Sequence, residues 1–421
     1  MRKLKVGVIV DLTIPPKTGG GYSYYQSFLN GINNHSFDEE LDIVNVVFYL
    51  GKKPVVNFNK PVVFIKGFIA NSFKRDFAKG LSFANRSKLK RNFLLRTAFA
   101  IVEKRNNRLV EKQLANHKID LIYYIKPEEL NLIDYPFIAN HWDVAHKSTF
   151  AFPELIMNKA YEQKDDHYTK VLARALSIFC ESNSGAAELR NYYSFSKEKI
   201  KVLPIFSNEA LNIKLDQKAA QDTLLKYSLQ KDCFFIYPAQ FWTYKNHYNL
   251  LLAFSQIKKR DDTAHLKLVL SGADYGNLNY IKEVTAKLSL NDSVIFTGFV
   301  SNEVLCAFYC NAIALVMPTF LGPTNMPLIE AAMLKCPVLC SDFAGHREIM
   351  EDNALYFEPA DAQAIERAMH QIINDDAARV NLIEAAYTHI NQSKFNLNKS
   401  LLVLNELLLE IKPIRMTWDV I

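Results

Sequence analysis

Short apolar runs alternate with amphipathic stretches along the first half of the chain. Helical stretches are expected from about Tyr22, over 104–117 and around 156–175. The runs predicted as buried strands cover residues 4–12, 41–50, 60–66, 119–125, 136–144 and 175–182. Apolar strands that alternate with helices are typical of a parallel sheet covered on both faces. The first half therefore predicts an α/β unit that ends near residues 199–210.

The same alternation restarts after a polar segment at 212–232. Five further strand-like runs, each followed by a helical run, cover residues 233–240, 265–272, 293–300, 312–319 and 336–342. We therefore predict two doubly wound α/β domains, residues 1–207 and 208–397, that face a central cleft. A terminal helix, predicted over 398–411 and ending at Pro413, belongs to a segment (398–421) whose docking partner is left open, with the first domain as the candidate. Ligands of such sheets bind at the carboxyl ends of the strands.

Composition indicates a folded, reduced protein that we expect in the cytoplasm. Of 421 residues, 49% are hydrophobic and 22% are charged, which is typical of a globular chain. The first apolar run breaks at Asp11, so we interpret it as a strand and not as a secretory leader. No run approaches the roughly 20 apolar residues that span a bilayer. The six cysteines are predicted as core thiols and not as metal ligands, because no histidine cluster accompanies them.

The net charge of +6 is unevenly distributed. Residues 71–112 contain twelve basic and three acidic residues, with phenylalanines and leucines between them. This mixture suits a surface that meets anionic lipid headgroups, and a peripheral position on the inner face of the cell membrane is one prediction. A solvated helical face is the alternative. Nucleic acid is not an expected partner, since no recognition motif accompanies the basic residues.

A glycine run, Gly19 to Gly21, follows the first predicted strand and precedes a helix. Backbone N–H groups at such a point can approach a phosphate or a sugar hydroxyl, which makes Gly20 and Gly21 candidate ligand contacts. A plain tight turn is the alternative. The spacing is not G-x-G-x-x-G, so a dinucleotide site is not expected.

Residues 316–350 read as a strand, a proline-rich turn, a helix and a second strand. The turn would expose backbone amides of Thr324, Asn325 and Met326 at the positive end of the helix, where a diphosphate binds well. Glu330 offers two acceptor oxygens for a ribose diol. Its alternative role is to complement the helix dipole from the first turn.

This segment resembles the signature of the large family of retaining GT-B glycosyltransferases that includes bacterial mannosyl- and rhamnosyltransferases of O-antigen and capsule synthesis. Glu330 matches the second of the family's two glutamates, and residues 334–341 match the strand that follows. Gly322 stands where the first glutamate, which in the family lies near the donor sugar, is expected. Sugar contacts would then fall to Thr324, Asn325 and Met326. The GPTNMP variant is itself similar to a subgroup of O-antigen transferases.

Two further segments resemble the same family in the same order. In 235–254, Lys245 matches a lysine that meets the donor's phosphates, while Gln240 stands in place of an arginine. In 293–312, Gly298 and Phe299 resemble the loop beside the nucleobase. The resemblance implies a GT-B fold, made of two Rossmann-like domains.

Polar residues also cluster after the strand predicted at 136–144. Asp143 would accept a hydrogen bond from an acceptor hydroxyl, and His146 would hold or relay a proton. The run through Phe-Pro-Glu at 152–154 resembles the same subgroup. We interpret His141 as structural, with a metal site formed by it, Asp143 and His146 as the minor alternative. A helix cap is predicted at 181–184.

The combined prediction is a retaining hexosyltransferase with Asp143, His146 and Glu330 as catalytic residues. It would move a sugar, with GDP-mannose as the first guess of donor, to a glycan or lipid-linked oligosaccharide acceptor in surface polysaccharide synthesis. No metal and no other cofactor is expected. The alternatives are a nucleotide-sugar epimerase of the same architecture and a non-catalytic binding protein, the latter suggested by Gly322 and Gln240.

Overall fold

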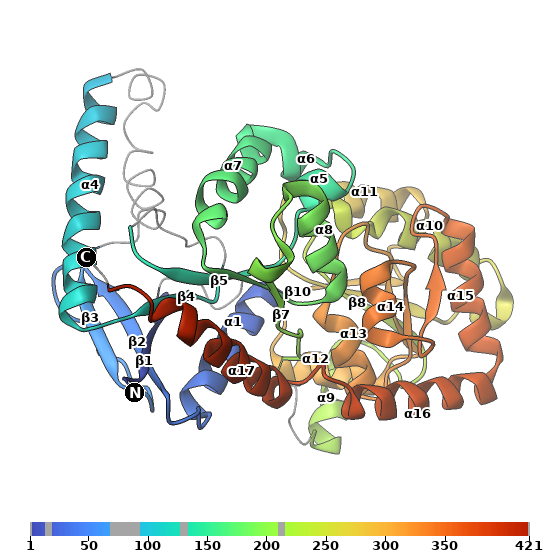
Figure 1. Cartoon of the computed structure of the whole chain (residues 1–421). Helices are drawn as coiled ribbons and strands as arrows, with labels where there is room; N and C mark the ends of the chain where they lie inside the picture. The colour runs from blue at the N-terminus through green and yellow to red at the C-terminus, as the bar shows by residue number, and fades with distance from the viewer. Residues whose placement is uncertain (1, 13–18, 68–92, 127–133, 209–214, 420–421) are drawn as a thin grey trace.

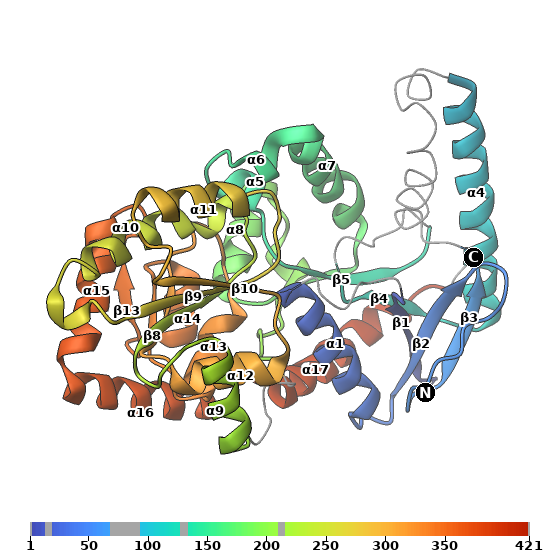
Figure 2. The ribbon, with the colours of Figure 1, turned by 180° about the vertical axis from the view of Figure 1, so that it is seen from behind.

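The computed structural model describes residues 2–12, 19–67, 93–126, 134–208 and 215–419. These residues form two α/β units, each built on a parallel sheet with helices on both sides (Figures 1 and 2). This is the two-sheet architecture predicted for the chain. Part of the basic segment, residues 71–92, lies outside the described residues.

The first unit contains a seven-stranded sheet in the order β3-β2-β1-β4-β5-β6-β7, with every neighbouring pair parallel. Its strands are β1 (Leu4–Val10), β2 (Leu41–Tyr49), β3 (Val62–Lys66), β4 (Leu121–Tyr124), β5 (Phe137–His141), β6 (Ser177–Cys180) and β7 (Ile200–Val202). Its longer helices are α1 (Gly20–Asn34), α4 (Phe93–Asn116) and α8 (Asn183–Tyr193), and shorter ones are α5 (Ala145–Ser148), α6 (Pro153–Ile156) and α7 (Ala160–Asp166). The strands are mostly apolar because helices cover both faces.

The second unit contains a six-stranded parallel sheet in the order β10-β9-β8-β11-β12-β13. Its strands are β8 (Phe234–Pro238), β9 (Lys267–Ser271), β10 (Val294–Gly298), β11 (Ala314–Met317), β12 (Val338–Ser341) and β13 (Leu355–Phe357). Its helices are α9 (Gln217–Lys226), α10 (His247–Ile257), α11 (Leu278–Lys287), α12 (Asn302–Asn311), α13 (Met326–Met333), α14 (Ala344–Met350), α15 (Ala362–Asn374) and α16 (Asp376–Gln392). Strands β7 and β13 were not predicted, because three residues are too short for a periodic signal.

The last helix, α17 (Leu397–Arg415), returns to the first unit and packs beside α1 (Figure 1). Ser400 donates a hydrogen bond to the Pro204 carbonyl at 2.7 Å, and the buried Arg415 guanidinium donates to the Asp120 carbonyl. The predicted helix end at Pro413 was wrong, since the helix continues to Arg415. The contacts of Arg415 outweigh the hydrogen bond that proline cannot donate.

The predicted long helix at 156–175 was also wrong. Asn158 and Lys159 have left-handed φ angles of 55° and 65°, which interrupt it before α7. A π-helical turn (His167–Val171) then places Tyr168 next to the end of β5, where its hydroxyl lies 3.1 Å from Nδ1 of His141. A tertiary contact therefore determines the backbone in this stretch.

All six cysteines are free. Cys180, Cys306, Cys336 and Cys340 are buried, as expected of core thiols. Cys310 is exposed, so the core assignment was wrong for this residue of α12.

Helix α4 projects from the body of the first unit (Figure 1). Within the described parts of the chain, no helix is both long and apolar enough to cross a membrane.

Candidate active site

A cavity of about 310 Å³ lies between the two units. It opens at the carboxyl ends of β8 and β11, where the strand order of the second sheet reverses, which is the usual ligand position in such sheets. The first unit contributes Gly19, Gly20, Gly21, Ser23, Tyr24, Trp142 and Glu181, and the second contributes residues that include Gln240, Lys245, Phe299, Thr324, Asn325, Met326 and Glu330. Three predicted site residues, Asp143, His146 and Gly298, are not among the lining residues.

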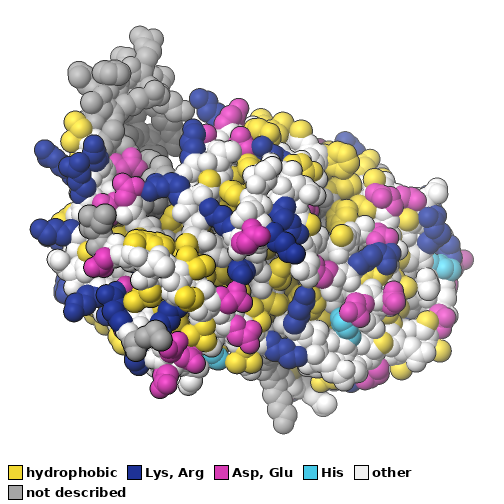
Figure 3. Space-filling model, viewed as in Figure 1, with side chains coloured by type: hydrophobic (Ala, Val, Ile, Leu, Met, Phe, Trp, Pro, Cys, Tyr) yellow, Lys and Arg dark blue, Asp and Glu magenta, His cyan; other side chains and the backbone are white. Residues whose placement is uncertain are grey.

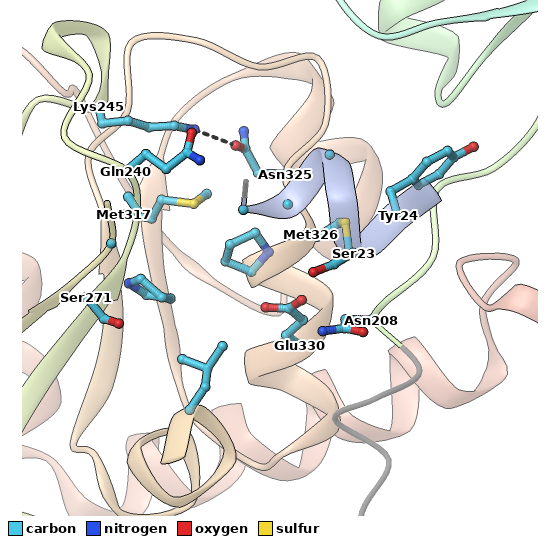
Figure 4. Close-up of a pocket in the computed structure, with 18 of the residues that line it drawn as sticks. Ser23, Tyr24, Asn208, Gln240, Lys245, Ser271, Met317, Asn325, Met326 and Glu330 are labelled. Atoms are coloured by element: carbon cyan, nitrogen blue, oxygen red, sulfur yellow. Dashed lines mark hydrogen bonds between the residues drawn. The ribbon is translucent and has the colours of Figure 1, made fainter. Parts of the chain in front are cut away.

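Lys245 is held at the edge of the cavity by a chain of hydrogen bonds (Figure 4). Its ammonium group donates to Oδ1 of Asn325 at 3.3 Å, and Nδ2 of Asn325 lies 3.0 Å from Nε2 of the buried His346. Nδ1 of His346 lies 2.7 Å from the Ser341 carbonyl, so this nitrogen carries the proton and Nε2 accepts. Burial lowers the pKa of His346 to about 4, which keeps the imidazole neutral. The Asn325 side chain is thus engaged at both ends.

Lys245 is the one cationic side chain among the described lining residues. Burial lowers its pKa to about 8, and the nearby charge of Asp143 acts in the opposite direction. The ammonium form still predominates at neutral pH, in a partly desolvated position where an anion is attracted more strongly than in water.

The start of α13 presents unpaired backbone donors to the same cavity. Asn325 precedes the helix, and its side chain makes no capping hydrogen bond. The N–H groups of Thr324, Asn325 and Met326 find no acceptor within the described residues. Free amides at the positive end of a helix, next to an ammonium group, form an anion-binding arrangement.

Glu330 lies further along α13, with Asn208 and Ser23 close to its carboxylate (Figure 4). It is 7% exposed, and the Tyr309 hydroxyl donates to its Oε2 at 3.2 Å. Burial raises its pKa to about 7, while the hydrogen bond from Tyr309 acts to lower it. The first turn of α13 contains no acidic residue, so Glu330 does not simply complement the helix dipole there. Its carboxylate is placed to accept hydrogen bonds from ligand hydroxyl groups.

Gly322, where the resemblance predicts a glutamate, occupies a backbone conformation that favours glycine. Its φ is +144°, and a Cβ atom there would lie 2.1 Å from Nδ2 of Asn325. The loop conformation that brings Asn325 to Lys245 therefore has no room for a side chain at this position.

The glycine run packs closely against the side chain of Gln240, which belongs to the opposite unit. Gly19 has a φ of +83°, and a Cβ atom there would lie 2.5 Å from Nε2 of Gln240. The indole of Trp242 donates to Oε1 of Gln240 at 2.9 Å. Gly20 and Gly21 form the first turn of α1, slightly earlier than predicted, and both line the cavity.

Of the two predicted site residues at the end of β10, one lines the cavity and the other does not. Phe299 lines the cavity with 46% of its surface exposed. Gly298 ends the strand outside the lining, where its carbonyl accepts a hydrogen bond from Ser271 at 3.2 Å.

Asp143 and His146, predicted as catalytic, are not among the residues that line the cavity. Oδ1 of Asp143 accepts a hydrogen bond from the Ala145 amide at 2.9 Å. The imidazole of His146 stacks on Tyr168 and lies 2.7 Å from the hydroxyl of Tyr193. Burial lowers the pKa of His146 to about 4, so it is neutral and enclosed. Within the described residues, no group of three or more His, Cys, Asp or Glu side chains is arranged to hold a metal ion.

Two glutamates of the first unit accept hydrogen bonds from the second unit, and neither was predicted as a site residue. Oε1 of Glu154 accepts a hydrogen bond from the Tyr244 amide at 3.0 Å, beside Lys245. Oε2 of Glu181 accepts one from the Thr324 hydroxyl at 2.6 Å. The helix cap was predicted correctly, since Ser182 accepts a hydrogen bond from the Gly185 amide at 3.0 Å. The only signal for Glu181 was its place after an apolar strand.

Comparison with protein families finds a match in the second unit. Residues 226–389 match the family described as Glycosyl transferases group 1. The O-antigen chain mannosyltransferase RfbU of Salmonella typhimurium is 28% identical over 167 residues, which cover 39% of this chain and 46% of RfbU. The aligned part thus spans less than half the length of that relative.

Solved structures match nearly the whole chain in fold. Sucrose-phosphate synthase from Thermosynechococcus elongatus superposes with a TM-score of 0.73 at 17% identity, over 98% of this chain and 100% of that one. HepE of Anabaena in complex with UDP-glucose superposes with a TM-score of 0.65 at 15% identity, over 96% and 99%. The chain therefore has the GT-B fold of these proteins, and its residues 226–389 are similar to the group 1 glycosyl transferases.

Proposed function

We propose that the chain is a retaining glycosyltransferase that moves a hexose from a nucleotide sugar to a glycan or lipid-linked oligosaccharide in surface polysaccharide synthesis. The observation that carries the proposal is the contact of Lys245 with Asn325 at the start of α13, with Glu330 further along the same helix. RfbU, named as an O-antigen mannosyltransferase, supports a mannose-like sugar, and the UDP-glucose complex of HepE supports a nucleotide-sugar donor.

In this proposal the diphosphate lies against Lys245 and the free amides of Thr324, Asn325 and Met326. Glu330 accepts hydrogen bonds from the ribose diol. As the bond between the anomeric carbon and the phosphate oxygen breaks, negative charge grows on the diphosphate. The ammonium group and the helix terminus stabilise that charge. The acceptor hydroxyl approaches from the face that the diphosphate leaves, its oxygen bonds to the anomeric carbon, and its proton passes to the departing diphosphate oxygen. Attack from this face keeps the anomeric configuration.

A panel of GDP, UDP, dTDP and ADP in thermal-shift assays tests the donor site, since a ligand that binds only the folded state raises the melting temperature. We expect one nucleotide to stabilise the wild type, and Lys245→Ala and Glu330→Ala to abolish that shift. No shift with any of the four would rule out the assignment. Retention is tested separately, by NMR of the product's anomeric configuration.

The comparisons do not favour the two alternatives, an epimerase or a non-catalytic binding protein. An epimerase would convert the nucleotide sugar without an acceptor. A binding protein would bind the nucleotide and show no turnover.

We further propose that the basic segment 71–112 attaches the enzyme to anionic membranes. In the described part of α4, Lys104, Arg105 and Arg108 are exposed beside the exposed apolar residues Ile101 and Leu109. Basic side chains gather over this helix in Figure 3. Flotation with vesicles that contain phosphatidylserine tests this: charge reversal at Lys104, Arg105 and Arg108 should reduce recovery with the vesicles. Equal recovery with neutral vesicles would contradict it.

A further inference from the structure

The cavity contains two carboxyl groups that come from different units. Glu330 belongs to α13 of the second unit, and Glu181 directly follows β6 of the first. Lys245 is the only other charged side chain among the described lining residues. The proposed function gives Glu330 and Lys245 a ligand group each, and it leaves Glu181 without one.

The three charged groups are attached at successive positions of the segment that leads into α13. Thr324 lies just before the helix and holds Glu181. Asn325 lies next and holds Lys245. Glu330 follows one turn into the helix. A nucleotide sugar has the matching order of parts: hexose, diphosphate and ribose. With the diphosphate at Lys245 and the ribose at Glu330, the hexose falls at Glu181.

The chemistry of Glu181 suits a hydroxyl group. Its Oε2 accepts the hydrogen bond from Thr324 at 2.6 Å, and its Oε1 makes no hydrogen bond within the described residues. A carboxylate repels phosphate and accepts hydrogen bonds from hydroxyls. Burial raises its pKa to about 7, so both the charged and the protonated form are available to a sugar at neutral pH.

The loop at Gly322 cannot supply this group from the second unit. A Cβ atom at Gly322 would collide with the Asn325 amide, and Thr324, two residues later, has only a hydroxyl. The carboxyl group on this side of the cavity therefore comes from the opposite unit.

We propose that Glu181 binds a hydroxyl group of the donor's hexose and thereby contributes to selection of the sugar. This inference rests on the proposed function. Glu181 belongs to the first unit, so its contact with the ligand would be made to the hexose and not to the diphosphate. Glu181 therefore adds affinity for the intact nucleotide sugar that the nucleoside diphosphate alone does not gain.

Isothermal titration of GDP against GDP-mannose, and of UDP against UDP-glucose, tests this. For the pair that the wild type binds, we expect Glu181→Gln to keep the diphosphate Kd within about twofold. The Kd of the nucleotide sugar should rise about tenfold, the order expected for a lost hydrogen bond to a charged group. Thr324→Val should weaken nucleotide-sugar binding in the same way, and Thr324→Ser, which keeps the hydroxyl, should restore it.

Glu188→Gln is the matched control. Glu188 lies on α8 of the same unit, burial also raises its pKa, and it does not line the cavity. It should leave both affinities unchanged. Unchanged nucleotide-sugar binding in Glu181→Gln, or an equal loss for the diphosphate, would overturn the inference. A wild type that binds none of GDP, UDP, dTDP and ADP would overturn the proposed function itself, and the inference with it.

Discussion

At the scale of single residues, the candidate site depends on ionisable groups whose protonation is set by burial. Lys245, Glu330 and Glu181 all have pKa values shifted toward neutrality, to about 8, 7 and 7. Removal from water disfavours the charged form of each. Ligand binding at this site should therefore vary with pH between about 6 and 9, a range where exposed lysines and glutamates do not titrate.

Nucleoside diphosphate binding should weaken as pH rises through the pKa of Lys245. The folded-state pKa is lowered, so the ammonium form is complete below it and is lost above about pH 8. Each pH unit beyond that point should then reduce affinity by up to about tenfold. Titration calorimetry between pH 7 and 9.5 measures this. Lys245→Arg, whose charge persists, is the control and should remove the decline. A wild-type affinity that stays constant to pH 9.5 would contradict the assignment.

Gly322→Ala should destabilise the loop before α13. The residue has a φ of +144°, and its new Cβ would meet the Asn325 amide at 2.1 Å. We expect a loss of about 1–3 kcal/mol in the free energy of unfolding and weaker nucleotide binding, because Asn325 must move away from Lys245. Gly276→Ala is the matched control, since Gly276 also has a positive φ, of +106°, but has open space around it. Equal effects of the two substitutions in chemical denaturation would argue against the steric explanation.

At the scale of elements, short turns present the site residues and contacts from elsewhere support those turns. The 3₁₀ turn Thr243–Lys245 follows β8 and presents Lys245. Asn246, in the left-handed region, caps α10 and donates to the carbonyls of Pro318 and Pro359 at 2.8 and 2.7 Å. Glu154 of α6 supports the same turn from the first unit. The position of Lys245 thus depends on both units.

Glu154→Ala should weaken nucleotide binding several-fold with little change in the melting temperature. It removes the acceptor for the Tyr244 amide, so the turn that carries Lys245 gains freedom. Glu154→Gln keeps an acceptor oxygen and should bind the nucleotide nearly as the wild type does. Calorimetry on the two variants separates the lost hydrogen bond from the lost charge. A similar loss in both would show that charge, and not support of the turn, is responsible.

At the scale of the whole molecule, the contact between the units completes the site. Helices α8 and α14 lie side by side (Figure 1). The Glu348 carboxylate accepts hydrogen bonds from the amides of Asn183 and Ser184, each at 2.9 Å. A carboxylate at the first amides of a helix complements the helix dipole. Glu348 therefore holds α8, and with it the neighbouring Glu181, against the second unit.

Glu348→Ala should favour a more open arrangement of the two units. We expect a larger radius of gyration in small-angle scattering and faster hydrogen exchange at the amides of Asn183 and Ser184. Glu384→Ala is the control, because it removes an exposed ion pair with Lys335 inside the second unit. A Glu348→Ala variant with the wild-type radius and exchange rates would contradict this role.

Much of the fold was predictable from the sequence because its signals are local. The apolar strands of both sheets and the glycine run at the start of α1 follow from neighbouring residues. The misses have physical causes: β13 is too short to show a period, and Arg415 carries α17 past Pro413 through a contact with Asp120. In the site, residues after β8 and β11 share one end of a parallel sheet, so it was predictable that Lys245 and Glu330 line one cavity.

Apart from Gly20 and Gly21, the tertiary structure alone decided which residues of the first unit line the cavity. Nothing in the local pattern separates Glu181, which lines it, from Asp143, which does not. His146, predicted to hold or relay a proton, stacks on Tyr168, and burial lowers its pKa to about 4. The sequence by itself determined the two sheets and the second unit's side of the site, because strand periodicity and helix starts depend on adjacent residues. Contacts between the units depend on how the two sheets face each other, which no local periodicity encodes.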